Sequence, residues 1–304
     1  MQFQGQYGIQ MNSIFITGGT GSFGHALVKK ILVEDILPSL CIAIYSRDEH
    51  KQEKMAANLK QYDQNQRLRF FIGDIRDKER LSLAMRTAVR VIHTAALKVV
   101  PTAEYNPFEC IKTNVIGSQN LVDCCLNARN NGSHIKMIAL STDKAVAPKN
   151  LYGATKLCME KLVLAANNIH GEYGPKFSIC RYGNVANSNG SVIQVFKSQR
   201  EQGLPLTVTD PRMTRYWITL DEAVKFVLDS LGKMQGGEVF IPDMPSFRVA
   251  DLAMAMSDAV SVTGVRAGEK IHEQLDEGRT SDNNALWLSQ RDLEGKLQEL
   301  GVLP

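Results

Sequence analysis

The sequence predicts a doubly wound parallel α/β sheet with a smaller C-terminal α/β lobe. Short apolar segments alternate with helical periodicity from residue 13 to residue 182, which is typical of a parallel sheet built from βαβ units. Beyond residue 185 this alternation weakens, and loop-like segments rich in arginine appear. A chain of 304 residues is long enough for one large domain and a lobe.

The first strand, 13–17, and a helix at 25–33 flank a turn with the spacing G-x-x-G-x-x-G. Gly18 permits a tight turn, Gly21 lets the backbone approach a pyrophosphate, and Gly24 lets the helix pack closely on the strand. The helix start offers N–H groups to phosphates, so the pattern predicts a Rossmann-type dinucleotide site, although the motif is weak evidence alone. The expected contacts here are Gly18, Thr20, Gly21, Ser22, Phe23 and Gly24.

The second strand, 40–45, ends in Ser46-Arg47-Asp48. A carboxylate at this position usually binds the ribose hydroxyl of NAD, whereas an arginine accommodates the 2′-phosphate of NADP. Because Ser46 and Arg47 come first, we expect NADP, and Asp48 keeps NAD open. Further cofactor contacts are expected at the ends of later strands and on the following helices, at Ser46, Arg47, Asp48, Asp74, Ile75, Ala95, Ala96, Asn114 and Val185.

The remaining elements follow in order. Strands are expected at 68–72, 89–96, 135–140 and 177–182, and helices at 50–61 and, as one long element carrying Asn114, 107–127. Residues 205–216 are expected to be loop-like, and Thr219 with Glu222 forms a capping box for the next helix. A last strand is expected at 238–242 and a helix at 249–260. His93 is expected to pack within its strand rather than to catalyse.

The candidate chemistry lies in residues 141–156. A buried strand ends in Thr142, Asp143 and Lys144, and a helix beginning near Leu151 places Tyr152 and Lys156 on one face. A phenol titrates near pH 10, and lowering its pKa to about 7 needs roughly 4 kcal/mol, which one nearby cation supplies at an effective dielectric of 20. We therefore expect Lys156 to favour the Tyr152 phenolate. Tyr-x-x-x-Lys is weak evidence for such a site when it occurs alone. In combination with the upstream glycine turn, in this order and at this separation, it becomes strong evidence.

Composition excludes several other classes. An apolar content of 44%, with 22% charged residues and a net charge of +3, is that of a globular protein and does not suggest nucleic-acid binding. No apolar run is long enough to span a membrane, and no signal peptide is evident. The six cysteines form no C-x-x-C pair, so we expect buried free thiols, no metal site and a cytoplasmic location. Residues 1–11 are expected to be a disordered leader.

Taken together, these motifs resemble the extended short-chain dehydrogenase/reductases, and more closely the inverting UDP-N-acetylglucosamine 4,6-dehydratases of surface-sugar biosynthesis. The Asp143-Lys144 pair is the most specific element, since retaining 4,6-dehydratases carry Asp-Glu there. The resemblance covers roughly residues 12–274 and rests on residues 17–24, 46–49, 104–107, 111–114, 141–145, 150–156, 181–185, 209–219 and 266–270. After residue 274 the resemblance weakens, because this chain has only residues 275–280 where members of the family have a segment several tens of residues longer.

The resemblance implies a role for each catalytic residue. Tyr152, assisted by Lys156 and Thr142, would accept the O4 proton while C4 gives hydride to NADP+. Lys144 would then remove the C5 proton, and Asp143 would protonate the departing C6 hydroxyl. Hydride would return to C6, and reprotonation on the opposite face would invert C5. Burial and Lys156 should lower the pKa of Lys144 and Asp143 should raise it, and the sequence leaves that balance open.

The resemblance also implies a UDP-sugar substrate and a homo-oligomer. The substrate would be held by Lys98, Asn184, Arg215, Arg266 and Glu269. By residue pattern alone, any one of these could be an ordinary solvated side chain. We expect a cofactor domain at 12–185, to which a segment near 217–244 returns, and a substrate lobe at 186–304. The alternatives are a UDP-sugar 4-epimerase, a retaining dehydratase, or a non-catalytic NADP-binding relative.

Overall fold

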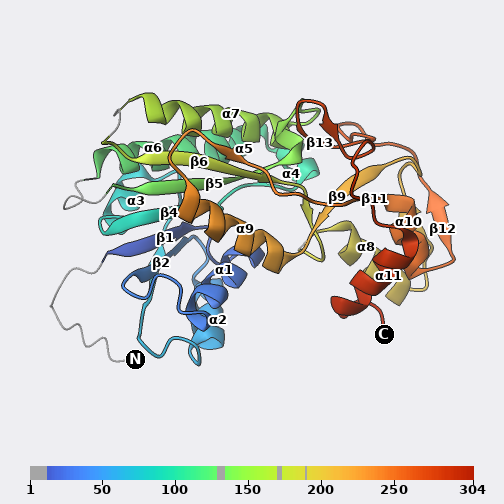
Figure 1. Cartoon of the computed structure of the whole chain (residues 1–304), viewed down its shortest axis with the longest axis horizontal. Helices are drawn as coiled ribbons and strands as arrows, with labels where there is room; N and C mark the ends of the chain where they lie inside the picture. Colours follow the sequence, from blue (N-terminus) through green and yellow to red (C-terminus); the bar gives the residue numbers. More distant parts are fainter. Residues whose placement is uncertain (1–11, 129–133, 170–172, 189) are drawn as a thin grey trace.

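The computed structural model describes residues 12–128, 134–169, 173–188 and 190–304. The predicted leader at 1–11 lies outside these residues. A seven-stranded sheet forms the larger part of the molecule, and all its pairings are parallel (Figure 1). Its strand order is β10-β6-β5-β4-β1-β2-β3. The strands are β1 (Ser13–Thr17), β2 (Cys41–Ser46), β3 (Leu68–Ile72), β4 (Ala88–His93), β5 (Lys136–Thr142), β6 (Lys176–Tyr182) and β10 (Val239–Phe240).

Helices cover both faces of this sheet, so it is doubly wound as predicted (Figure 1). One face carries α3 (Lys78–Ala84), α6 (Gly117–Asn127) and α7 (Leu151–Ala165), and the other carries α1 (Ser22–Val33), α2 (Glu49–Leu59) and α9 (Leu220–Lys233). The remaining helical segments are α4 (Val100–Tyr105), α5 (Pro107–Ile111), η1 (Lys112–Ile116), η2 (Asp143–Ala145) and η3 (Ala166–Asn168).

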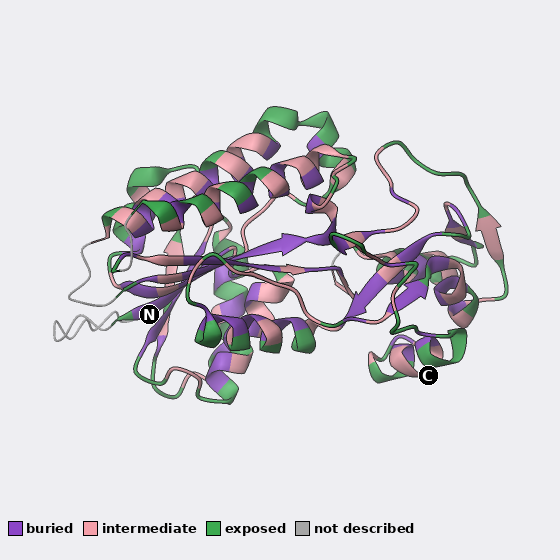
Figure 2. Ribbon diagram, turned by 45° about the horizontal axis from the view of Figure 1, so that its top comes forward, coloured by how far each residue is buried: buried purple, intermediate pink, exposed green. Residues whose placement is uncertain are grey.

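Alternation along the strands builds one apolar layer on each face. In β1, Ile14 and Ile16 pack toward α1, while Phe15 packs into the opposite layer with Tyr45 and Val91. All five residues of β1 are buried, as expected for a strand covered on both faces (Figure 2). This double burial explains why the central strands read as continuous apolar runs. Because all these strands pair in parallel, their carboxyl ends lie at one edge of the sheet.

The C-terminal lobe is a separate cluster around Phe196, Trp217 and Phe247. It lies to the right of the large sheet in Figure 1. Two small sheets, β11-β9-β7 and β12-β8, contribute to it, and β13 pairs with β14 in a hairpin. The elements are β7 (Asn184–Val185), α8 (Val192–Glu201), β8 (Leu206–Val208), β9 (Thr214–Ile218), β11 (Ser246–Arg248), α10 (Val249–Met256), β12 (Val260–Val262), β13 (Gln274–Asp276), β14 (Arg279–Thr280) and α11 (Gln290–Glu299).

Three predicted elements are wrong in detail. The single helix at 107–127 is interrupted by the π-helical turn η1. Residues 205–216 are not simply a loop, because β8 and the start of β9 lie there and pair with strands distant in sequence, which local pattern cannot reveal. The segment at 238–242 is not the last strand, since β11 to β14 follow. The capping box of Thr219 and Glu222 is confirmed.

Candidate active site

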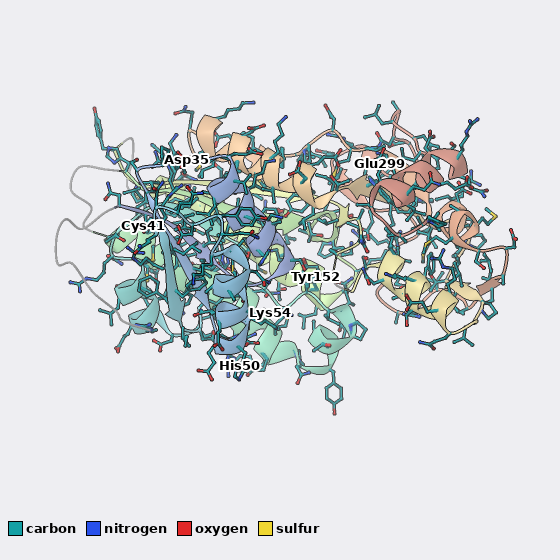
Figure 3. The ribbon with its side chains drawn as sticks, turned by 90° about the horizontal axis from the view of Figure 1, so that it is seen from below. Asp35, Cys41, His50, Lys54, Tyr152 and Glu299 are labelled. Carbon is teal, nitrogen blue, oxygen red and sulfur yellow. The ribbon has the colours of Figure 1, made fainter. Side chains whose placement is uncertain are left out.

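A cleft of about 750 Å³ opens at the carboxyl ends of the sheet strands. In an open parallel sheet this edge is where ligands bind. The view in Figure 3 labels Tyr152, which lies on the side of the sheet domain that faces the C-terminal lobe. The predicted site residues that line the cleft are Gly18, Thr20, Gly21, Ser22, Phe23, Gly24, Ser46, Arg47, Asp48, Asp74, Ile75, Ala95, Ala96, Lys98, Thr142, Lys144, Tyr152, Lys156, Asn184 and Val185.

The glycine turn forms one wall. Gly18 has a φ of +66°, and a Cβ placed there would lie 2.8 Å from the backbone of Ala95. A Cβ on Gly24 would collide with the backbone of Gly19. Gly21 is the N-cap of α1, and no side chain caps that turn. The turn therefore offers backbone N–H groups to the cleft, which suits a pyrophosphate.

Arg47 is the exposed cation at the end of β2. Its guanidinium lies 3.8 Å from the Asp74 carboxylate and the side chain is 58% exposed. The Asp48 carboxylate already has partners within its own helix. It caps the start of α2 by accepting the Lys51 N–H, and it lies 3.4 Å from the Lys51 amine. Asp74 pairs with Arg76 at 2.7 Å. Arg47 is thus better placed than Asp48 to meet a ligand.

Asn114 lies in the π-helical turn and is buried beneath the cleft. Its amide accepts the Leu97 N–H at 2.8 Å and donates to the Leu97 carbonyl at 2.9 Å. It also donates to the Thr155 hydroxyl on α7 at 3.0 Å. Asn114 therefore joins the loop after β4 to the helix that carries Tyr152, and it supports the cleft wall rather than lining it.

Asp143 and Lys144 form a 3₁₀ turn directly after β5. The Lys144 amine donates to Asp143 Oδ1 at 2.9 Å and to Asn184 Oδ1 at 3.1 Å. The Thr142 hydroxyl also donates to Asp143 Oδ1, at 2.9 Å. Asp143 is fully buried and its Oδ2 has no hydrogen-bond partner in the described structure. The three predicted residues are thus joined in one hydrogen-bonded set.

Protonation of this set is governed by burial and by carboxylates. Burial raises the pKa of Asp143 and outweighs the opposing Lys144 charge, and the Glu273 carboxylate adds a smaller rise. Burial alone would lower the pKa of Lys144, but Asp143 and Glu273 outweigh it and raise that pKa above its ordinary value. The balance that the sequence left open therefore falls toward the ammonium form.

The structure does not show the expected lowering of the Tyr152 pKa by Lys156. Burial raises the pKa of Tyr152 to about 12, against the opposing effects of the Lys144 charge and a hydrogen bond with Thr142. The Lys156 amine donates instead to the Leu140 carbonyl at 2.6 Å, and burial lowers its pKa to about 8. The expectation was wrong because both groups are desolvated, a cost that the simple Coulomb argument omitted.

Glu273 is a site residue that sequence reasoning missed. Its buried carboxylate lies 3.3 Å from the Lys144 amine, 3.6 Å from Lys270 and 3.9 Å from Arg215. These three cations outweigh burial and lower the pKa of Glu273. A glutamate 129 positions after Lys144 gives no local signal of this contact.

The predicted substrate residues divide into two groups. Lys98 and Asn184 line the cleft. Arg215 is not among the lining residues, and its guanidinium donates to the carbonyls of Ile271 and Lys270 at 3.0 and 3.1 Å. Arg266 is exposed, and its N–H donates to Glu269 at 3.3 Å. The structure does not bring these last three side chains to the cleft lining.

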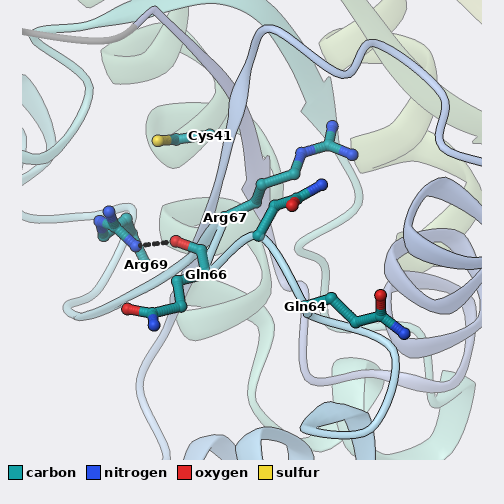
Figure 4. Close-up of a pocket in the computed structure, with 6 residues that line it drawn as sticks. Cys41, Gln64, Gln66, Arg67 and Arg69 are labelled. Carbon is teal, nitrogen blue, oxygen red and sulfur yellow. Dashed lines mark hydrogen bonds between the residues drawn. The ribbon is translucent and has the colours of Figure 1, made fainter.

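A second, smaller pocket of about 280 Å³ lies at the other end of the sheet, near Cys41 and Arg67 (Figure 4). The side chains there are mostly amides and arginines, and Arg67 is occupied by the carbonyls of Leu40, Ile36 and Leu37. None of the predicted site residues lies there. Within the described ranges, no group of three or more His, Cys, Asp and Glu side chains could hold a metal ion.

A parallel Rossmann-type sheet whose cleft combines the G-x-x-G-x-x-G turn with Tyr152 and Lys156 defines an extended short-chain dehydrogenase/reductase. More narrowly, the chain belongs to the polysaccharide biosynthesis protein family, whose model matches residues 14–286.

Individual relatives agree with this family. The chain is 54% identical over 264 residues to "UDP-N-acetylglucosamine 4,6-dehydratase (inverting)" of Campylobacter jejuni subsp. jejuni serotype O:23/36 (strain 81-176), covering 86% of this chain and 76% of that one. It is 41% identical to a protein named UDP-glucose 4-epimerase from Rickettsia prowazekii (strain Madrid E), covering 86% and 77%. The solved structure of Pen from Bacillus thuringiensis has a TM-score of 0.84 at 30% identity, covering 95% and 98%.

Proposed function

We propose that the protein is an inverting UDP-N-acetylglucosamine 4,6-dehydratase, a hydro-lyase that forms a UDP-2-acetamido-2,6-dideoxy-4-hexulose. The observation that carries the proposal is the Asp143–Lys144 pair, joined at 2.9 Å, in which Lys144 lines the cleft with Tyr152 and Asp143 is buried directly behind the lining. An acid and a base adjacent to each other are what elimination of water across C5 and C6 requires. The 54% identical relative bears the name of this activity.

NADP is the proposed cofactor, with NAD as the alternative. The uncapped start of α1 suits its pyrophosphate, and Arg47 with Lys51 suits a 2′-phosphate, since both line the cleft. The bound cofactor would accept the C4 hydride and later return it to C6. The proposed cradle comprises the glycine turn, the end of β2 and the segment after β4.

The chain's own residues would handle the protons. Tyr152 would take the O4 proton, aided by its hydrogen bond with Thr142, which opposes the rise in its pKa. Lys156, one helical turn away, is the other proposed member of this pair. Lys144, as the free amine, would remove the C5 proton, while Asp143 protonates the C6 hydroxyl that leaves as water. Burial raises the pKa of Asp143, which favours its acid form. Reprotonation of C5 on the opposite face then gives inversion.

The UDP-sugar would lie between the cleft and the C-terminal lobe. Lys98 and Asn184 are the proposed substrate contacts nearest the reaction. Arg215, Arg266 and Glu269 are the substrate contacts that we propose for the C-terminal lobe. Because those three lie outside the cleft lining, we propose that they engage the UDP-sugar only after side-chain rearrangement. We also propose a cytoplasmic homo-oligomer, with a cofactor domain at 12–185 to which a segment near 217–244 returns, and a mainly substrate-binding lobe at 186–304. Within the described residues, no helix could cross a membrane.

The test is incubation with UDP-N-acetylglucosamine, with and without added NADP, and identification of the product by NMR. A 4-keto-6-deoxy sugar is expected, with no net reduction of cofactor. A C4 epimer would instead assign the chain to the activity named for the Rickettsia relative, and an unchanged sugar with tight NADP binding would indicate a non-catalytic relative. Retained C5 configuration would indicate a retaining dehydratase.

A further inference from the structure

The buried carboxylate of Glu273 is not used in the mechanism above, although it contacts the proposed base. Its Oε1 lies 3.3 Å from the Lys144 amine. Glu273 is 2% exposed, and its Oε2 has no hydrogen-bond partner in the described structure. Burying a charge is costly unless it is paired, and here Lys144, Lys270 and Arg215 supply the pairing.

The position of Glu273 is fixed by several contacts. Its N–H donates to the Ser281 hydroxyl at 2.9 Å, and the neighbouring His272 bridges to Thr214 of β9. Ser281 is fully buried and also contacts the Thr214 hydroxyl at 2.6 Å. The short β13–β14 hairpin, turning at Gly278, connects these two segments. Glu273 is therefore held against Lys144 by backbone pairing rather than by the ion pair alone.

We propose that Glu273 is a positioning residue that orients the Lys144 amine and makes it a stronger base for the C5 proton. This deepens the proposed function and rests on it. The charged and titratable groups that face Lys144 are Asp143 on its own turn, Glu273 and Lys270 from the segment before β13, Arg215 from β9, and the Tyr152 phenol from α7. Arg215 and Lys270 keep Glu273 ionised, since both lower the pKa of its carboxyl.

The proton balance shows where this charge acts. The resting pair of Lys144 ammonium and Asp143 carboxylate holds the same protons as the working pair of free amine and carboxylic acid. Transfer of one proton along the 2.9 Å hydrogen bond converts the first pair into the second. In the elimination, the C5–H bond breaks and an N–H bond forms on Lys144. The C6–O bond breaks, its oxygen takes the Asp143 proton, and water leaves, so the cluster returns to the ion pair.

The Glu273 charge favours this return, because a new ammonium forms 3.3 Å from it as the C5 proton is removed. The Glu273 charge also raises the pKa of Asp143, which favours the carboxylic acid form that protonates the departing C6 oxygen. Glu273 is not expected to touch the sugar. Its removal should therefore slow the C5 step and leave C4 oxidation intact.

The experiment compares Glu273→Gln with wild type, and uses Glu277→Gln, the same change at an exposed position of the hairpin, as the matched control. In heavy water with UDP-N-acetylglucosamine, Glu273→Gln should slow deuterium entry at C5 by about 100-fold or more. Reduced cofactor should accumulate, because C4 oxidation proceeds without elimination. Glu273→Asp, which keeps the charge, should recover part of the C5 rate.

A second readout does not need turnover. An amine-reactive label, followed by peptide mass spectrometry across pH, reports the pH at which Lys144 becomes a free amine. This midpoint should fall in Glu273→Gln and stay unchanged in Glu277→Gln. If the amide variant does not fold, the comparison is made with Glu273→Asp, in which the changed distance to the charge should also lower the midpoint.

The outcomes separate the two proposals. Wild type that labels as expected but converts no UDP-sugar would overturn the proposed function alone. Glu273→Gln with wild-type C5 exchange and an unchanged Lys144 midpoint would overturn the role of Glu273 alone. Equal slowing of C4 oxidation and C5 exchange would also overturn it, because that pattern indicates only a damaged site.

Discussion

The Lys144 amine and the Asp143 carboxylate, side chains of adjacent residues, meet at 2.9 Å across the tip of a 3₁₀ turn. Neighbouring side chains on a strand would point to opposite faces, so the turn is what brings them together. It follows directly on β5, and α7 packs against it. The arrangement places an acid and a base on one side of the cleft.

The first prediction concerns Lys144→Gln. Without the base, elimination should fall by about 10²- to 10⁴-fold, the usual contribution of a general base. C4 oxidation should continue, so reduced cofactor should accumulate when the sugar is added, as followed by its absorbance. Tyr152→Phe is the matched comparison, because it should prevent cofactor reduction altogether. Equal loss of both steps in Lys144→Gln would contradict the assignment.

The second prediction concerns cofactor choice. Arg47→Ser should weaken NADP binding by about tenfold or more and leave NAD binding nearly unchanged, since only NADP carries the 2′-phosphate that Arg47 would meet. Binding of both cofactors is measured by calorimetry. The exposed Arg69, at the distant small pocket, supplies the control variant Arg69→Ser. Preference for NAD in the wild-type protein would refute the role given to Arg47.

The third prediction concerns Gly153 on α7. A Cβ there would collide with the Lys144 carbonyl oxygen, so Gly153→Ala must displace the turn or the helix. We expect a loss of about 1–3 kcal/mol in the free energy of unfolding, together with reduced activity. Gly295→Ala, in the open interior of α11, should instead stabilise by about 0.5–1 kcal/mol. Urea unfolding measures both, and a neutral Gly153→Ala would show that this packing is wrong.

The fourth prediction concerns acid stability. His93 is buried between Thr17 and Ser118, and burial followed by the Lys156 charge lowers its pKa to about 3. Because the folded pKa lies below the unfolded value of about 6.5, its stabilising contribution is present above pH 6.5 and is lost as the pH falls toward 3. Between pH 7 and 5 the loss should be about 2 kcal/mol. His93→Gln should lack it, as measured by urea unfolding at both pH values; an identical loss in the variant would exclude His93 as its source.

The sequence was sufficient for much of this architecture because its signals are local. The glycine turn follows β1 directly, and Tyr152 and Lys156 are one helical turn apart. These local patterns, together with the predicted parallel sheet and the family resemblance, were enough to assign both motifs to one site. His93 is packed within its strand, as expected. Five of the six cysteines are buried, but Cys158 is exposed, because it lies on the outer face of α7.

The features that the sequence did not reveal depend on distant contacts. The pairing of His272 with Thr214 helps to hold Glu273 against Lys144, and it joins segments that are far apart in the sequence. Strand β9 likewise pairs with β7 and β11, which are distant from it in the sequence. The pKa values of Tyr152 and Lys156 depend on burial, which spacing does not measure. Arg215 was predicted as a substrate contact from its motif, yet its guanidinium is bonded to carbonyls of the segment that carries Glu273.

The central claim is that Lys144 and Asp143 remove water across C5 and C6 with inversion at C5. The most direct measurement is NMR of the product formed from UDP-N-acetylglucosamine in heavy water, without added cofactor and then with NADP. The account predicts a 4-keto-6-deoxy sugar that carries deuterium at C5 and has the inverted ring configuration. A product with retained C5 configuration, or a C4 epimer without deuterium at C5, would contradict it.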